Sequence, residues 1–141
     1  MASAIVAKIR AHFPRFVLLV AWVLLVLWLA LTPSPPRVSG VFGWDKLQHA
    51  AAFAVVTLLA GWSFAPLGTR PLPGWFRGWL FAVFWGALIE VLQGTLTRTR
   101  TADWRDFLAD LLGAGAVYLA AVYWHRRQAG RRDFFTTTLR R

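Results

Sequence analysis

Four long apolar stretches alternate with short polar segments along the chain. They cover about residues 16–31, 45–64, 75–96 and 102–124. Each approaches the roughly 20 residues that an α-helix needs to cross a hydrocarbon core about 30 Å thick. Prolines follow the first stretch from Pro33 and the second at Pro66, where neither helix can continue. We therefore predict an all-α fold, an integral membrane bundle of four transmembrane helices.

The polar segments between these stretches are short, at about residues 37–43, 66–74 and 95–101. Short connections favour antiparallel neighbours, so the four spans are expected to form a single domain. A basic C-terminal tail, residues 125–141, follows the last span. The basic residues before the first span also fit a secretory signal peptide. However, prolines follow that span in place of a small-residue cleavage site, which favours a retained helix.

Composition agrees with a membrane protein and removes several classes of function. Hydrophobic residues make up 57% of the 141 positions, more than a soluble domain usually carries. The chain has no cysteine, which excludes disulfides, thiolate metal sites and a cysteine nucleophile. A net charge of +10 would suit nucleic acid in a soluble protein. No nucleic-acid-binding motif accompanies that charge, and we expect no such partner.

The basic residues are distributed unevenly between the two sides of the predicted bundle. Eleven of the 16 Lys and Arg residues fall on the two tails and the second loop, and five fall on the first and third loops. Cytoplasmic segments of membrane proteins are enriched in Lys and Arg, so both termini are predicted to be cytoplasmic. The start of the second span, the end of the third and the start of the fourth then converge at the outer face.

Five of the six acidic residues lie at these three helix ends, although a charge at a membrane helix centre costs about 2.5–3.5 kcal/mol. Asp45 and His49 are four residues apart on the second span and share one face, whereas Lys46 is expected to turn away towards lipid headgroups. Glu90 lies roughly 9 Å below the outer edge of the third span. A carboxylate at that depth must be paired, protonated or in contact with water. Gln93 follows it on the same face.

The fourth span carries its acidic residues along one side. Asp103, Asp106, Asp110 and Gly113 form a single helical stripe. Small residues along this stripe favour close approach of a neighbouring helix, so the stripe is expected to face the interior of the bundle. Arg98 and Arg100 in the preceding loop can fold over it and offer planar donors to a phosphate or carboxylate group.

Three motifs therefore follow one another in a fixed order. They are Asp45-Lys46-Leu47-Gln48-His49, then Glu90-Val91-Leu92-Gln93, then Arg100 followed by Asp106, Asp110 and Gly113. Together they resemble the VanZ-like membrane proteins, whose pattern is D-K-x-x-H, E-x-x-Q, and R with a later D-x-x-x-N-x-x-G. The match covers about residues 45–115, and Asp110 departs from the asparagine that is usual in the family. The resemblance implies a multi-pass protein of the bacterial inner (cytoplasmic) membrane and a cell-envelope context. The name-giving member of the family is associated with resistance to the glycopeptide antibiotic teicoplanin.

The first of three hypotheses is an outward-facing polar pocket for an anionic lipid headgroup. The ligand is a membrane lipid such as a lipid-linked phosphate or pyrophosphate, which the protein binds and, in one version, also acts on. In this hypothesis His49, Glu90 and Asp45 are catalytic, and the ligand-binding residues are Lys46, Gln93, Arg98, Arg100, Asp106 and Asp110.

Two other hypotheses stay open. In one, the protein is a metal-dependent membrane hydrolase or transferase in which His49 and nearby carboxylates bind a divalent cation. Because no H-E-x-x-H or similar ligand spacing is present, we predict no resident cofactor. In the other, the polar residues are structural or bind a protein partner. The sequence contains no G-x-S-x-G or P-loop motif, and an oligomer is compatible with all three hypotheses.

Overall fold

A computed structural model describes residues 2–33, 45–67, 70–97 and 103–138, with side chains at positions 12–33, 45–67, 70–97 and 103–130. The described residues form four α-helices, which are α1 Ala2–Leu31, α2 Asp45–Phe64, α3 Pro71–Leu96 and α4 Trp104–Thr138. A short 3₁₀ turn, η2, occupies Ala65–Leu67. Each of the four helices contains a stretch long and apolar enough to cross a membrane. The predicted all-α, multi-pass membrane fold is therefore confirmed.

Three helix boundaries differ from those expected. α1 starts earlier, at Ala2, and contains Pro14 within it. α3 begins at Pro71 and not at Trp75, because proline is tolerated in the first turn of a helix, where its missing N–H has no intrahelical partner to lose. α4 continues beyond the expected end of the fourth span to Thr138, so most of the basic tail is helical. Arginine, a good helix former, makes up half of residues 125–132 at the start of that tail.

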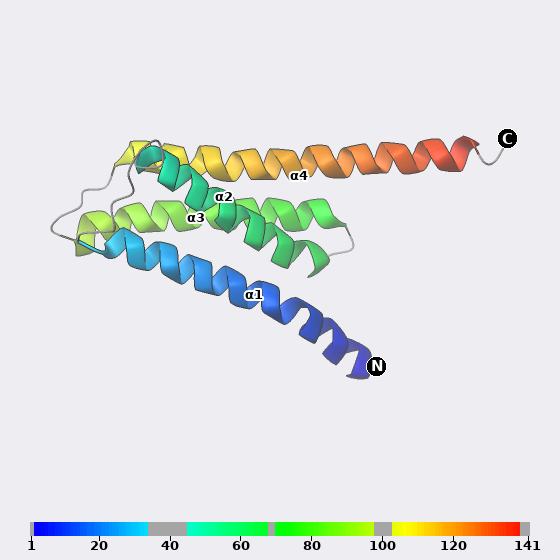
Figure 1. The fold of residues 1–141 in the computed structure, drawn as a ribbon, viewed down its shortest axis with the longest axis horizontal. Helices are drawn as coiled ribbons and strands as arrows, with labels where there is room; N and C mark the ends of the chain where they lie inside the picture. Colours follow the sequence, from blue (N-terminus) through cyan, green and yellow to red (C-terminus); the bar gives the residue numbers. More distant parts are fainter. Residues whose placement is uncertain (1, 34–44, 68–69, 98–102, 139–141) are drawn as a thin grey trace.

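The helices form an antiparallel bundle in which α2 crosses between the others (Figure 1). α2 packs against α1, α3 and α4, whereas α1 contacts α2 and α3 but not α4 within the described residues. The buried apolar core includes Val23, Val26, Phe53, Val56, Ala82, Ile89 and Ala114. Large apolar side chains also cover the outside, with Phe84 68% and Leu112 73% exposed, as expected for a surface that faces lipid.

Glycines bring α2 close to α3 and to α4. A Cβ atom on Gly113 of α4 would overlap the carbonyl group of Ala50 on α2. A Cβ atom on Gly78 of α3 would lie 2.5 Å from the backbone nitrogen of Gly61 on α2. Small residues at such crossings allow membrane helices to approach closely, so the expected approach at Gly113 is confirmed. This crossing brings the polar residues that precede Ala50 and Gly113 beside each other.

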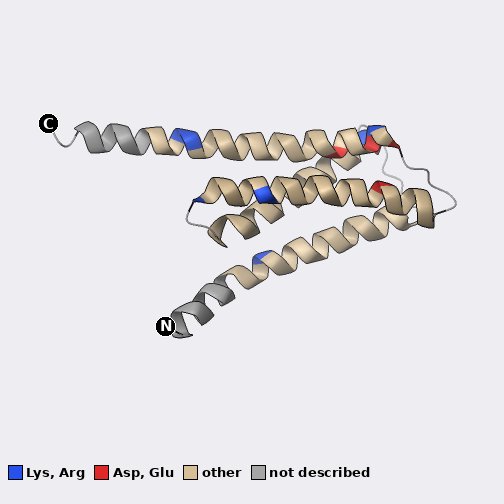
Figure 2. Ribbon diagram, turned by 180° about the vertical axis from the view of Figure 1, so that it is seen from behind, with Lys and Arg blue, Asp and Glu red and all other residues tan. Residues whose placement is uncertain are grey.

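Charged side chains are divided between the two ends of the bundle (Figure 2). Both chain termini lie at one end, together with the arginines near the start of α3 and in the second half of α4. The acidic side chains that the structure describes lie at the opposite end, on or next to α2, α3 and α4. The expected convergence of three helix ends is therefore confirmed. The assignment of this end to the outer face stays a prediction from the count of basic residues.

Candidate functional site

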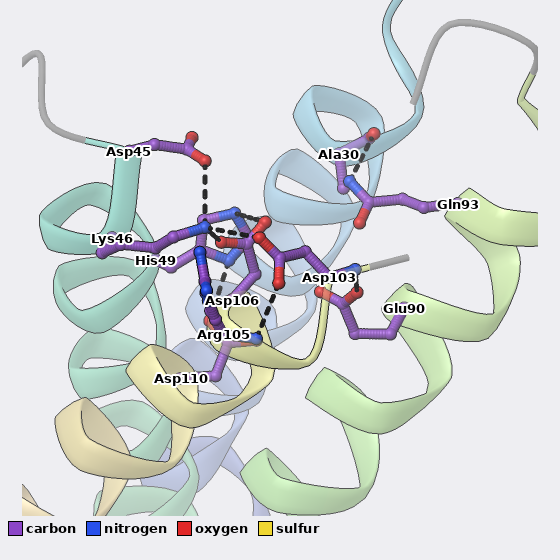
Figure 3. A network of polar contacts seen from close by, with 10 residues as sticks. All are labelled: Ala30, Asp45, Lys46, His49, Glu90, Gln93, Asp103, Arg105, Asp106 and Asp110. Carbon is purple, nitrogen blue, oxygen red and sulfur yellow. Dashed lines mark hydrogen bonds and ion pairs between the residues drawn. The ribbon is translucent and has the colours of Figure 1, made fainter. Parts of the chain in front are cut away.

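Seven of the described ionisable side chains at the end remote from the termini form one polar cluster (Figure 3). It consists of Asp45, Lys46, His49, Glu90, Asp103, Asp106 and Asp110. All but Asp103 belong to the predicted set of site residues. Of the other predicted residues, Arg98 and Arg100 lie outside the described residues, and Gln93 has a different contact.

Lys46 connects α2 to the start of α4. Its Nζ atom donates to Asp106 and, at 3.0 Å, to Asp103 Oδ2, and it lies 3.7 Å from Asp45 Oδ2. The Lys46 side chain is 26% exposed and that of Asp106 is 13% exposed, so their ion pair is partly shielded from solvent. The expectation that Lys46 turns away from His49 is wrong. Positions i and i+3 of a helix are neighbours, and both side chains face α4.

His49 lies between the two buried aspartates of α4. Its Nδ1 atom is 3.0 Å from Asp110 Oδ1, and its Nε2 atom is 3.7 Å from Asp106 Oδ2. The side chain of Asp110 is 2% exposed and that of His49 is 15% exposed. Asp106 and Asp110 are four residues apart, so one face of α4 presents both carboxylates to the same ring. The contact with Asp110 fixes the orientation of the imidazole, as a carboxylate does for a histidine that transfers protons.

Glu90 brings α3 into the polar cluster. Its Oε2 atom accepts a 2.8 Å hydrogen bond from the backbone N–H of Asp103. Glu90 is only 8% exposed, and its other oxygen, Oε1, has no hydrogen-bond partner among the described residues. Asp110 Oδ2 also lacks a partner within that part of the chain. Buried polar atoms are nearly always hydrogen-bonded, so two unpartnered carboxylate oxygens in one cluster need a physical explanation.

Asp103 is a residue of the cluster that sequence analysis places only in the acidic stripe. Its Oδ1 atom accepts a hydrogen bond from the Arg105 N–H at 2.9 Å, and its carbonyl oxygen accepts one from the Asp106 N–H at 2.8 Å. These are the contacts of an N-terminal helix cap. The Arg105 N–H and the Lys46 ammonium lower the pKa of the Asp103 carboxyl group. An acidic residue directly before an apolar run is the sequence signal that could have identified this cap.

Gln93 connects α3 to α1. Its Nε2 atom donates to the Ala30 carbonyl oxygen at 2.9 Å, and the residue is 3% exposed. A second polar link to α1 runs from Trp22 Nε1 to the Ala52 carbonyl oxygen at 3.1 Å. The Gln93 amide nitrogen is thus directed to a helix backbone, which is a bond that positions α1 beside the cluster.

Two sets of three side chains in the polar cluster bring potential metal-ligand atoms within 4.8 Å of one another. The outer set is Asp45, His49 and Asp106, and the inner set is His49, Glu90 and Asp110. Imidazole nitrogen and carboxylate oxygen together suit divalent ions such as Mn²⁺ and Zn²⁺. The described cluster contains five carboxyl groups, one ammonium group and one imidazole, so its chemistry favours binding of cations and transfer of protons.

Comparison with protein-family models, curated proteins and solved structures gives no match for this chain. The assignment of a function is therefore based on the geometry of the polar cluster and on the motifs in the sequence.

Proposed function

We propose that this chain is a VanZ-like protein of the bacterial cell envelope whose polar cluster binds the phosphate headgroup of a membrane lipid at the outer face. The position of His49 is the observation that carries this proposal. Its ring lies about one turn inside the start of α2, is held by Asp110, and is near the exposed Asp45 at the rim. A lipid-linked phosphate or pyrophosphate has its charge at this level while its hydrocarbon chain stays in the bilayer.

An acid-rich cluster needs added positive charge before it can bind an anion. Arg98 and Arg100 belong to the short segment that leads from the end of α3 to Asp103, a member of the cluster. In the proposal these guanidinium groups form paired hydrogen bonds with the phosphate oxygens. Lys46 has a different role, because its ammonium group already pairs with Asp45 of α2 and Asp106 of α4.

His49 is the proposed proton-transfer group. Asp110 orients Nδ1, and Nε2 lies 3.7 Å from Asp106, in the half of the cluster that includes the exposed Asp45. In the catalytic version of the proposal, Nε2 accepts a proton from water or a hydroxyl group as its oxygen bonds to the phosphorus. The bond from phosphorus to the leaving oxygen breaks, and the leaving oxygen finally takes up that proton. Asp110 then stabilises the imidazolium, as a carboxylate does in catalytic triads.

Lipid capture tests the proposal. Full-length protein purified in detergent is mixed with a polyprenyl phosphate or a zwitterionic phospholipid, and bound lipid is counted by native mass spectrometry. We expect the protein to retain the polyprenyl phosphate in preference to the zwitterionic phospholipid. Arg100→Ala should reduce retention of the polyprenyl phosphate by about tenfold. Arg77→Ala is the matched control, because Arg77 lies near the start of α3 at the other end of the bundle. Equal retention by wild type and Arg100→Ala would contradict the proposal.

A purely structural role is the second candidate, and the cross-links within the cluster favour it. Lys46 joins α2 to α4, and Glu90 joins α3 to the residue before α4. Glu90→Gln separates the two candidates, because the amide oxygen can still accept the Asp103 N–H bond while the charge is lost. A folded Glu90→Gln protein that captures less polyprenyl phosphate would exclude a purely structural role, whereas a Glu90→Gln protein that does not fold would favour it.

A further inference from the structure

The two candidate cation sites share His49 but differ in what already neutralises them. In the outer set, Asp106 is bonded to the Lys46 ammonium group, which also lies 3.7 Å from Asp45 Oδ2. A metal ion there would have to bind carboxylates that already pair with a positive charge. In the inner set, neither Glu90 nor Asp110 has an ion pair with a described Lys or Arg side chain. The inner set is therefore the one that lacks a cation.

The inner set is also buried and has unpartnered oxygen atoms. Glu90 is 8% exposed and Asp110 is 1% exposed. Glu90 Oε1 and Asp110 Oδ2 have no hydrogen-bond partner within the described part of the chain. The Glu90 side chain points from α3 towards the residues of α2 and α4 (Figure 3). Burial of two ionised carboxylates is strongly unfavourable unless a positive charge compensates them.

Gly86 allows the free oxygen of Asp110 to lie close to the backbone of α3. A Cβ atom on Gly86 would lie 3.1 Å from Asp110 Oδ2 and 3.2 Å from Phe53 Cε1. Gly86 is four residues before Glu90, so both lie on the same face of α3. The part of α3 next to Asp110 is therefore bare backbone, and a side chain there would crowd an oxygen that has no other partner among the described residues.

We propose that His49, Glu90 and Asp110 bind a divalent transition-metal ion, of which Mn²⁺ and Zn²⁺ fit the ligand types best. Their potential ligand atoms lie within 4.8 Å of one another, so short side-chain movements bring them to bond lengths of about 2.0–2.2 Å. One imidazole and two carboxylates leave coordination positions for water or a phosphate oxygen. The ion thus adds positive charge to an acid-rich cluster. Its role at the headgroup rests on the binding version of the proposed function, because a metal-bound His49 no longer has a free nitrogen to accept a proton, whereas binding of the ion rests on neither version.

Titration of the full-length protein with Mn²⁺ tests the cation site. The protein is purified in detergent, treated with a chelator and titrated while the free ion is followed by its electron paramagnetic resonance signal. We expect about one Mn²⁺ per chain, displaced by Zn²⁺. Glu90→Gln and His49→Gln should each weaken binding at least about tenfold. Asp103→Asn is the matched control: it removes a carboxylate from the same cluster but from neither ligand set, and asparagine also caps helices.

Several outcomes would overturn the cation site. One is the absence of saturable Mn²⁺ and Zn²⁺ binding by the wild-type protein. Another is a loss of binding in Asp45→Asn with none in Glu90→Gln, which would assign the ion to the outer set. Pulsed paramagnetic resonance of the Mn²⁺-loaded wild type should show coupling to an imidazole nitrogen. This measurement does not depend on the folding of any variant. If no coupling to an imidazole nitrogen is observed, the proposal is also overturned.

Lipid capture with and without the chelator separates the cation site from the proposed function. Saturable Mn²⁺ binding with no capture of the phosphate lipid would leave the cation site intact and overturn the proposed function. Equal lipid capture with and without the chelator would support the headgroup site and overturn a role of the ion in it. We expect capture to fall about tenfold after chelation.

Discussion

Lys46 lies among three carboxylates, and loss of its ammonium group would leave them uncompensated. We expect Lys46→Met to lower the free energy of unfolding by about 1–3 kcal/mol, because Asp106, 13% exposed, loses its charged donor. Thermal unfolding in detergent, followed by circular dichroism, measures the change. Asp45→Asn is the control, since an exposed pair at 3.7 Å contributes less than about 1 kcal/mol. Equal losses in the two variants would contradict this difference between the ion pairs.

Asp103 makes the stability of the folded protein dependent on pH in the acidic range. The Arg105 N–H and the Lys46 ammonium hold the pKa of its carboxyl group below the ordinary value of 3.8. A carboxyl group with a lower pKa in the folded state stabilises the fold above its unfolded pKa, and this contribution is lost as the pH falls through the folded value. Below about pH 4, the wild-type protein should therefore lose stability relative to Asp103→Asn. Above about pH 5, the difference in stability between the two proteins should stay constant. Unfolding midpoints of both proteins measure this, and parallel curves would count against it.

At the scale of helices, two glycines of α4 lead to opposite predictions. Gly113→Ala should destabilise the protein by about 1–3 kcal/mol, because the new Cβ atom would overlap the Ala50 carbonyl group on α2. A Cβ atom on Gly115 would meet no neighbouring atom within 4 Å among the described residues. Gly115→Ala should therefore be neutral or stabilise the helix by up to about 1 kcal/mol. Thermal unfolding of both variants checks the crossing of α2 and α4, and similar midpoints would argue for a looser contact.

The order of the helices and the end at which their polar residues meet could be predicted, because apolar length and antiparallel connection determine both. The individual contacts between side chains could not be predicted. A helix that is apolar on all sides has no stripe that marks its inward face, so the rotation of α2 that turns Lys46 towards α4 is not visible in the pattern. The same limit applies to Gln93, whose bond to Ala30 depends on the placement of α1. The start of α3 at Pro71 was harder still to predict, since proline occurs both in loops and in the first turn of helices.

At the scale of the whole molecule, the two ends of the bundle should be accessible from opposite sides of the membrane. The chain has no cysteine, so single substitutions give unambiguous labels. Pro33→Cys follows the end of α1 at the acidic end, and Gln128→Cys lies on α4 at the end with the termini. With both termini cytoplasmic, an impermeant maleimide should label Pro33→Cys in intact cells and Gln128→Cys only after lysis. The reverse pattern would invert the topology and place the polar cluster inside.

The separation of acidic and basic side chains along the bundle also couples the molecule to the membrane voltage. Inverting the protein would carry carboxylates and arginines across the potential in opposite directions, at about 2.3 kcal/mol per elementary charge for 100 mV. In a cell with a negative interior, the electrical energy is lower with the 11 Lys and Arg residues of the tails and second loop inside, because the five on the other face offset its five carboxylates. The resting voltage would therefore hold the inserted bundle in the same orientation that its basic tails favour during insertion.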